Sequence, residues 1–442
     1  MPEEIPDCPK KPNPAPEAGR PFEIELITPM FGGGVEPRTN DPSFPIRTTA
    51  IRGQLQFWWR ATVGAQYADR QALRAAQSAI WGSTEQASRV EVRVQNVEAA
   101  NPQRCATFEP DRNAPGKYRS VPTWNPPFNN NSLSYALFPF QGQLADGRTR
   151  IEVEPAACNH KASFRLILRC HKDFNFEKDV EPALHAWILF GGLGSRTRRG
   201  CGSVRCKALE VKDRNELMQK LKGFLQPSQP VHPWPTLAEA ILVGPEQTTA
   251  IPAWDQAIEL LRDFRQGVGF ARNPGQQPNR PGRSRWPEPE TIRRVTKRRA
   301  PLHQRLEHVP DNAFLRAEIG LPIVFHFKDE RPGDPPDTIL YAGNGSDGEK
   351  RERMASPLIL KARALGNGKF VPIIMRLKAP SLEGVDLRQG ERSLPLPTPT
   401  LLRDPKLATY PNSPMNGRSS QGSALEAFLV YAKERRFTEV TR

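Results

Sequence analysis

The sequence GGLGSRTRRGCGSV, residues 191–204, holds five glycines and three arginines and no acidic residue. Glycine tolerates positive φ and lets another backbone come close, so this density predicts a loop shaped for contact. Arg196, Arg198 and Arg199 add forked cationic donors to the free backbone N–H groups of such a loop. Phosphate suits both kinds of donor. The stretch therefore predicts a loop that contacts a phosphate-bearing partner.

Two common glycine-rich nucleotide sites are excluded by spacing. A P-loop requires Lys and then Ser or Thr after its second glycine, but Gly200 is followed by Cys201. The dinucleotide fingerprint requires a third glycine three residues after Gly194, where the chain has Thr197. The loop matches neither template.

The segments around this loop predict one α+β unit. Phe22, Ile24 and Leu26 alternate with acidic residues as in a half-buried strand, and Pro182 opens a short apolar helix just before the loop. The expected elements are a strand at 22–30, a helix at 50–67, strands at 88–98 and 162–170, a helix at 180–192 and a strand at 202–211. Strand, helix, strand, strand, helix, strand is the βαββαβ order of a ferredoxin-like, RRM-like domain.

The helix expected at 50–67 is amphipathic, and Thr48 or Thr49 is placed to cap its start. Its apolar side chains fall within an arc of about 140° at 100° per residue. They are Leu55, Trp58, Trp59, Thr62 and Val63. The tryptophans are expected in the core, with base stacking as the alternative. Arg52 and Arg60 border this face, either as solvated charges or as contacts to an anion.

A second α+β domain is expected after residue 212. There the chain shows a helix at 253–266, strands at 320–328, 357–365 and 369–379, and a last helix at 422–436. We divide the chain into a mobile proline-rich arm (1–20), an N-terminal domain (21–212) and a C-terminal domain (213–442). The Pro/Asn-rich stretch 99–150 is a long insertion between strands of the first domain.

Charge points to a polyanionic partner. The 442 residues include 63 Lys and Arg against 48 Asp and Glu, a formal net charge of +15. Residues 272–299 hold nine basic and two acidic residues beside Trp286, a composition expected of a single-strand-binding surface. A basic loop of no specific role is the alternative. Trp286 either stacks on a base or pins this proline-rich loop to the domain.

Several classes of protein and site are excluded. No apolar run approaches the roughly 18 residues of a membrane span, and the N-terminus lacks the apolar segment of a signal peptide, so we expect a soluble cytoplasmic protein. The six cysteines are too sparse for a disulfide scaffold and are expected as reduced thiols. Metal-ligand atoms occur at Cys158, His160, Cys170 and His171, but their spacing matches no standard zinc pattern, and no metal is expected.

Together these motifs resemble a known family. FEIELITPMFGGG (22–34), IRGQLQFWWRA (51–61), AIWGSTEQASRVEV (79–92) and the glycine-rich loop are similar to the RAMP superfamily of CRISPR-associated RNA-binding proteins. Adding PGRSRWPEPETIRR (281–294), GLPIVFHFKD (320–329) and RMASPLILK (353–361) makes the chain most similar to the first-numbered subunit of the type III-B Cmr effector complex. The arm and the insertion at 99–150 match nothing diagnostic of the family.

The resemblance implies a fold, a role and partners. It implies two tandem ferredoxin-like domains with long loop insertions, in a subunit that caps a ribonucleoprotein complex. That subunit contacts the 3′ part of the guide RNA, the single-stranded target RNA or both, together with other Cmr subunits, in antiviral defence. It implies no cofactor or metal.

The glycine-rich loop implies the site residues. By the resemblance, Arg196, Arg198 and Arg199 are candidate phosphate contacts, and the expected loop formers are Gly191, Gly192, Gly194, Gly200 and Gly202. We add a positive track to the RNA-binding candidates from their charge and position. Its members are Arg47, Arg52, Arg60, Arg283, Arg285, Arg293 and Arg294.

Two other functions stay open. Some relatives in the superfamily cut RNA, and backbone subunits of type III complexes use an aspartate in the loop after the first strand. Asp41, in RTNDPSF (38–44), occupies that loop here. An Asn-Asp-Pro sequence is also typical of a turn in which the aspartate caps its own backbone, and the loop has no histidine, so a non-catalytic subunit is expected. A purely architectural capping protein is the second alternative.

Overall fold

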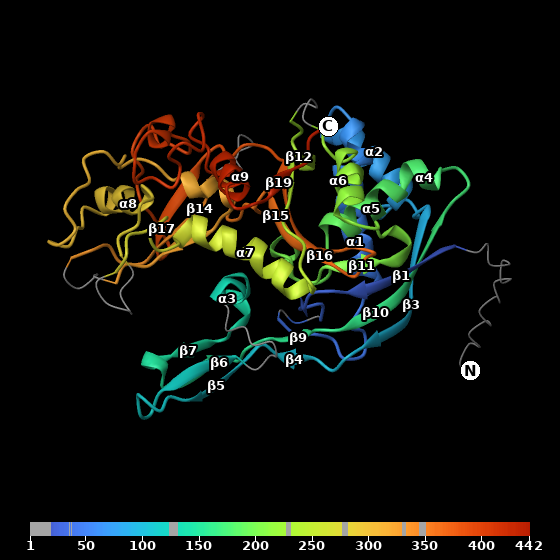
Figure 1. Ribbon diagram of the computed structural model, residues 1–442, viewed down its shortest axis with the longest axis horizontal. Helices are drawn as coiled ribbons and strands as arrows, with labels where there is room; N and C mark the ends of the chain where they lie inside the picture. The colour runs from blue at the N-terminus through green and yellow to red at the C-terminus, as the bar shows by residue number, and fades with distance from the viewer. Residues whose placement is uncertain are drawn as a thin grey trace, which may run out of the picture.

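The computed structural model describes residues 19–34, 36, 38–122, 131–226, 231–275, 282–328, 333–343 and 351–442. Within them the chain mixes helices with antiparallel sheets, which confirms the predicted α+β class. Figure 1 shows two units of sheet and helices beside each other. The predicted arm lies, apart from its last two residues, outside the described residues. No helix in the described part of the chain is both long and apolar enough to cross a membrane.

The first unit follows the predicted element order. It consists of β1 (Arg20–Leu26), α1 (Thr48–Ala61), β3 (Val90–Ala99), β10 (Ala162–Cys170), α5 (Glu181–Phe190) and β11 (Val204–Cys206). The sheet order is β11-β1-β10-β3, and α1 and α5 cover one face of it (Figure 1). Phe22, Ile24 and Leu26 are buried between more exposed neighbours, as their alternation predicts.

The second unit repeats this order of elements. Its members are β12 (Thr236–Val243), α7 (Ala250–Gln266), β15 (Leu358–Ala364), β16 (Phe370–Lys378), α9 (Ala424–Lys433) and β19 (Thr438–Glu439), in the sheet order β15-β16-β12-β19. β12 lies at the centre of this sheet and was not predicted. Its sequence, TLAEAILV, is a nearly continuous apolar run, which periodicity cannot assign to strand or helix.

Two further groups of elements decorate these units. α8 (Glu288–Thr296) packs on a small sheet of β13 (Ile323–Phe325), β14 (Thr338–Ala342), β17 (Val385–Gln389) and β18 (Arg392–Ser393). The insertion at 99–150 carries α3 (Asn131–Leu137) and two hairpins, β5 (Ala106–Pro110) with β6 (Tyr118–Pro122) and β7 (Gln143–Ala145) with β8 (Arg150–Val153). The hairpins project away from the two main sheets (Figure 1).

Helix α1 was predicted well in its buried face and wrongly at both ends, since it ends at Ala61 and not at residue 67. Trp58 and Trp59 are each only 2% exposed, which places them in the core. The predicted capping threonine was wrong, because Thr48 already belongs to the helix. The N-cap position is taken by Arg47, whose side chain makes no capping hydrogen bond.

The apolar cores of the two units are shared. One buried cluster joins Trp58 and Trp187 of the first unit to Ile373 on β16, and the other includes Phe31 and Cys201 beside Trp254 of α7. Because burial of apolar surface is the main favourable term in folding, this shared core fixes the units against each other. The domain boundary between residues 212 and 213 stays a prediction.

Candidate nucleic-acid interface

The glycine-rich loop after α5 is closed by its own backbone. Leu193 donates an N–H to the carbonyl of Gly202 at 2.8 Å, and Gly202 donates to Pro29 at 2.8 Å. At Gly202, with φ +66°, a Cβ would lie 1.8 Å from the Leu193 carbonyl oxygen. Glycine is required there by both the left-handed backbone and the close approach. The loop was predicted to contact another molecule, whereas Gly202 is required for a close contact within the chain itself.

The second unit holds the loop from the other side. The Arg199 guanidinium donates to the Leu358 carbonyl at 3.1 Å, and Arg198 donates to the Ser356 carbonyl. The Trp254 indole N–H donates back to the Arg199 carbonyl at 2.6 Å. Burial lowers the pKa of Arg199 to about 9, which leaves it charged at neutral pH. Sequence reasoning missed this intramolecular role of Arg198 and Arg199, and their contact with phosphate stays a prediction.

Two buried cations on β15 anchor the start of the loop. The Lys361 ammonium donates to the Gly191 carbonyl at 2.7 Å and to the Ile188 carbonyl at 3.3 Å. The Arg363 guanidinium donates to the Ile188 carbonyl at 3.5 Å and, after the loop, to the Leu209 carbonyl at 3.2 Å. Cations at the C-terminal carbonyls of a helix such as α5 are favourable. Burial, aided by the charge of Arg363, lowers the pKa of Lys361 well below its usual value. Neither residue was predicted, because a cation in the apolar stretch LILKARA does not reveal its partner.

A small hollow lies where the loop meets the first turn of α1. It measures about 340 Å³ and is lined by Gly33, Arg47, Thr49, Gly194 and Ser195, among others. One terminal nitrogen of the Arg47 guanidinium donates to the Gly34 carbonyl at 3.0 Å, while its Nε has no partner among the described residues. The structure thus brings Arg47 and Gly194 together, as the positive track requires.

Arg52 and Arg60 lie elsewhere. Arg52 donates to the Trp81 carbonyl and, at 3.1 Å, to the Ser88 hydroxyl, and Arg60 donates to the Gln77 side chain at 3.1 Å. Burial lowers the pKa of both guanidinium groups. These contacts hold α2 (Arg70–Trp81) and the loop after it against α1. The interpretation of Arg52 and Arg60 as part of one track with the glycine-rich loop does not fit this placement.

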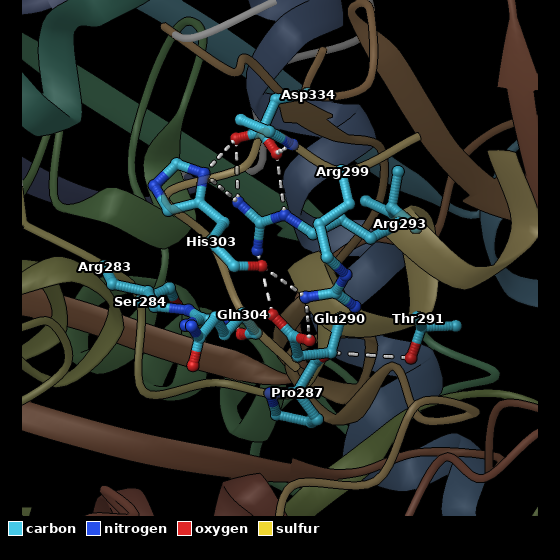
Figure 2. Close-up of polar contacts among 12 residues, drawn as sticks. Arg283, Ser284, Pro287, Glu290, Thr291, Arg293, Arg299, His303, Gln304 and Asp334 are labelled. Carbon is cyan, nitrogen blue, oxygen red and sulfur yellow. Dashed lines mark hydrogen bonds and ion pairs between the residues drawn. The ribbon is translucent and has the colours of Figure 1, made fainter. Parts of the chain in front are cut away.

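The basic segment 272–299 is largely folded into an ion network, shown in Figure 2. The Glu290 carboxylate accepts from Arg283 at 2.7 Å and from Arg293 and Arg299 at 2.9 Å each. The Arg293 guanidinium also donates to both carboxylate oxygens of Asp334, at 3.0 and 2.9 Å. Buried charges are tolerated only when paired in this way. Arg283 and Arg293 therefore have a structural role that their composition did not reveal.

Arg285, Trp286 and Arg294 of this segment also have partners within the chain. Arg285 donates to the Asn273 side chain at 2.8 Å, and the half-exposed Arg294 pairs with Asp311 at 2.8 Å. Trp286 is 1% exposed and meets the ring of Phe264 edge-on at 5.3 Å between centroids. This burial favours the interpretation that Trp286 pins the segment to the domain. Arg294 is the most exposed of the four predicted arginines in this segment.

Asp41 caps a turn. Its Oδ1 accepts the backbone N–H groups of Ser43 at 2.9 Å and Phe44 at 3.0 Å. This is the local capping predicted from the Asn-Asp-Pro sequence.

The five cysteines among the described residues are free thiols, as predicted, and three of them come together. Burial, aided by nearby Cys105 and Cys201, raises the pKa of Cys158 to about 12, so these thiols are protonated and inert. Within the described ranges, no group of three or more His, Cys, Asp or Glu residues is placed to hold a metal ion.

Comparisons with known proteins show what the first unit is similar to. Residues 23–205 match the profile of the RAMP superfamily. The Cmr subunit Cmr1-2 of the Pyrococcus furiosus CRISPR system is 27% identical over 194 residues, which are 42% of this chain and 95% of that protein. Subunit Cmr1-1 of the same organism is 26% identical over 186 residues, 42% of this chain and 46% of that protein, so the match spans under half of its length.

Solved structures of Cmr proteins also match this chain, at lower sequence identity. The crystal structure of apo Cmr1 from Pyrococcus furiosus matches with a TM-score of 0.47 and 16% identity, covering 95% of this chain and 98% of that one. A chain in the cryo-EM structure of type III-B Cmr-beta bound to cognate target RNA matches with a TM-score of 0.42 and 14% identity, covering 81% and 94%. The resemblance to the RAMP superfamily is therefore confirmed over residues 23–205, and the curated relatives are Cmr1 subunits.

Proposed function

We propose that this chain is a non-catalytic, RNA-binding subunit of a type III-B Cmr effector complex, built from two ferredoxin-like units. Its partners are the other Cmr subunits and single-stranded RNA, either the 3′ part of the guide, the target or both. The observation that carries the proposal is the RAMP superfamily match over residues 23–205, joined to curated relatives that are Cmr subunits. The net charge of +15 supports a polyanionic partner.

Such a subunit needs no sequence readout of its own. A guide RNA delegates sequence recognition to base pairing, and the protein then contacts phosphate and sugar. The hollow between Arg47 and Gly194 and the neighbouring Arg196 offer the donors for this task. A purely architectural cap would leave these donors unused.

Binding of the full chain to labelled single-stranded RNA across a salt series tests the proposal. Affinity should fall with salt, because each phosphate neutralised contributes about −0.7 to the log–log slope. Arg47→Gln should flatten that slope by about 0.7, while Arg119→Gln, which removes an exposed charge already paired with Glu109, serves as the charge-matched control. A chain that shows no salt-dependent RNA binding would contradict the RNA-binding role and favour the architectural one.

The same proposal predicts that Asp41 is dispensable for chemistry. Since its carboxylate already accepts two backbone N–H groups, Asp41→Ala should loosen the turn at Ser43 and leave RNA cleavage by the assembled complex unchanged. The measurement is the pattern of target fragments from complexes that contain either chain, with magnesium present. Loss of one cleavage product would identify Asp41 as a nuclease residue and overturn the non-catalytic assignment.

A further inference from the structure

A groove of about 910 Å³ opens on the second unit, beside the glycine-rich loop. Its walls are α3, the last turn of α7, the loop that follows α7, and the start of β13. Figure 1 shows α3 directly beneath α7. The size is that of a cavity that binds a ligand. Of its wall residues, Arg196 was a named candidate from the sequence, and Arg272 belongs to the basic segment 272–299 whose composition is expected of a single-strand-binding surface.

Arginines dominate the lining of this groove. They are Arg196, Arg262, Arg265, Arg272 and Arg316. Asp263 is the one acidic residue that the described lining contributes, and it is already paired with Arg262 at 2.8 Å. Arg316 is paired with the buried Glu288 at 3.2 Å, so the excess charge comes from the other three arginines. The groove therefore carries a surplus of positive charge within low-dielectric walls, which focuses the field on an incoming anion.

Three of these arginines keep donors for a ligand. The Nε atoms of Arg196 and Arg272 are buried without a partner among the described residues. Arg265 gives one N–H to the Tyr135 hydroxyl at 2.9 Å and retains the rest of its fork. A buried donor without a partner costs free energy, and an anion in the groove would remove that cost.

Burial also lowers the pKa of Arg196. The Arg196 guanidinium has thus lost hydration without gaining a counter-ion among the described residues. The arginines around Glu290, in contrast, are paired with its carboxylate. The backbone of Arg196 is left-handed, with φ +57°, which turns the side chain of a glycine-rich loop residue toward the second unit. Holding this cation at the groove therefore lowers the stability of the fold.

Exposed apolar side chains line the same opening. Phe138, Val268 and Val324 are 74%, 59% and 63% exposed, and all three contribute to the groove. Guanidinium groups beside an accessible aromatic ring are the combination that binds single strands, because phosphates meet the cations and bases stack on the ring. The carboxylates of an acidic protein segment would pair with the same forked donors. The exposed ring of Phe138 favours a strand that carries bases, because bases stack on it.

We propose that this groove binds a short segment of single-stranded nucleic acid. Its phosphates lie on Arg196, Arg265 and Arg272, and a base stacks on Phe138. This inference depends on the proposed function in one respect, which is that the bound polyanion is RNA. The groove is a second contact site, separate from the hollow at Arg47.

The test compares binding of fluorescein-labelled hexauridylate to the full chain and to a double variant, Arg265→Gln with Arg272→Gln. We expect affinity at low salt to drop roughly tenfold and the log–log salt slope to flatten by about 1.4, two contacts at 0.7 each. The matched control is Arg74→Gln with Arg89→Gln, which removes two exposed charges on and just after α2. Lysine at 265 and 272 should restore the slope, since it restores the charge.

Each outcome decides between stated alternatives. If the unaltered chain binds no RNA, the proposed function and the groove fail together. If it binds and the double variant keeps the same affinity and slope, the groove alone is wrong. If oligoglutamate displaces the RNA from the unaltered chain and binds the double variant more weakly, the groove is a docking site for an acidic protein segment, and the nucleic-acid assignment is overturned. A lowered melting temperature would show that the double variant is misfolded. The variant with lysine at 265 and 272 then tests the groove instead, because its salt slope should equal that of the unaltered chain.

Discussion

Glu290→Ala should lower the free energy of unfolding by about 3–5 kcal/mol, the usual cost of removing one partner from a buried ion network. Glu290 is 2% exposed and is the shared acceptor of Arg283, Arg293 and Arg299. Without its carboxylate, three guanidinium groups lie together at the edge of α8, and among the described residues Asp334 is the carboxylate left to offset them. Urea unfolding followed by tryptophan fluorescence measures the loss.

The control for this variant is Glu109→Ala. Glu109 pairs with Arg119 across the β5–β6 hairpin at 3.4 Å, with both side chains about half exposed. Exposed pairs contribute at most about 1 kcal/mol, because water already solvates both charges. Equal losses in the two variants would show that the network around Glu290 is no more than a surface cluster.

Acid should weaken the same network. Burial alone would raise the pKa of Glu290 and of Asp334, but the hydrogen bonds from Arg283, Arg299 and Arg293 outweigh it and lower both. The stabilisation is therefore complete above the usual values of 4.5 and 3.8, and it is lost as pH falls through the lowered ones. Glu290→Gln, which cannot titrate, should show a shallower loss of stability between pH 5 and about pH 3.

Local patterns predicted the elements of the first unit. The alternation in β1, the apolar run in β10 and Pro182 at the start of α5 each depend on neighbours in sequence, so they can be read without the fold. β12 was missed because a strand buried on both faces loses its alternation.

The partners of the arginines could not be predicted in this way. Arg293 meets Asp334, and Arg199 meets Leu358, across 41 and 159 residues of sequence. A cluster of basic residues has the same composition whether it binds RNA or holds carboxylates and carbonyls of its own chain. Only the tertiary arrangement separates Arg196 and Arg272, whose buried Nε atoms have no partner among the described residues, from Arg293, whose three guanidinium nitrogens all meet carboxylates.

Gly200→Ala should destabilise the chain by about 2–5 kcal/mol and loosen the attachment of the glycine-rich loop to the second unit. Gly200 has φ +81°, which costs an L-residue roughly 1–2 kcal/mol. An added Cβ would also lie 2.5 Å from the Trp254 ring and 2.8 Å from the Leu360 carbonyl oxygen, and such overpacking costs about 1–3 kcal/mol more.

The backbone cost can be separated from the contact cost by Gly368→Ala. Gly368 has φ +78°, and no atom lies within 4 Å of the place that an alanine methyl group would take. This variant should therefore lose only the backbone cost of roughly 1–2 kcal/mol. Trp254→Leu combined with Gly200→Ala should recover part of the second, since the smaller side chain leaves room for the methyl group. If Gly200→Ala and Gly368→Ala lower the melting temperature equally, then the Trp254 side chain moves aside with no cost in stability. In that case the close fit of α7 is not what attaches the glycine-rich loop to the second unit, and Lys361 and Arg199 must carry that attachment through their bonds to backbone carbonyls.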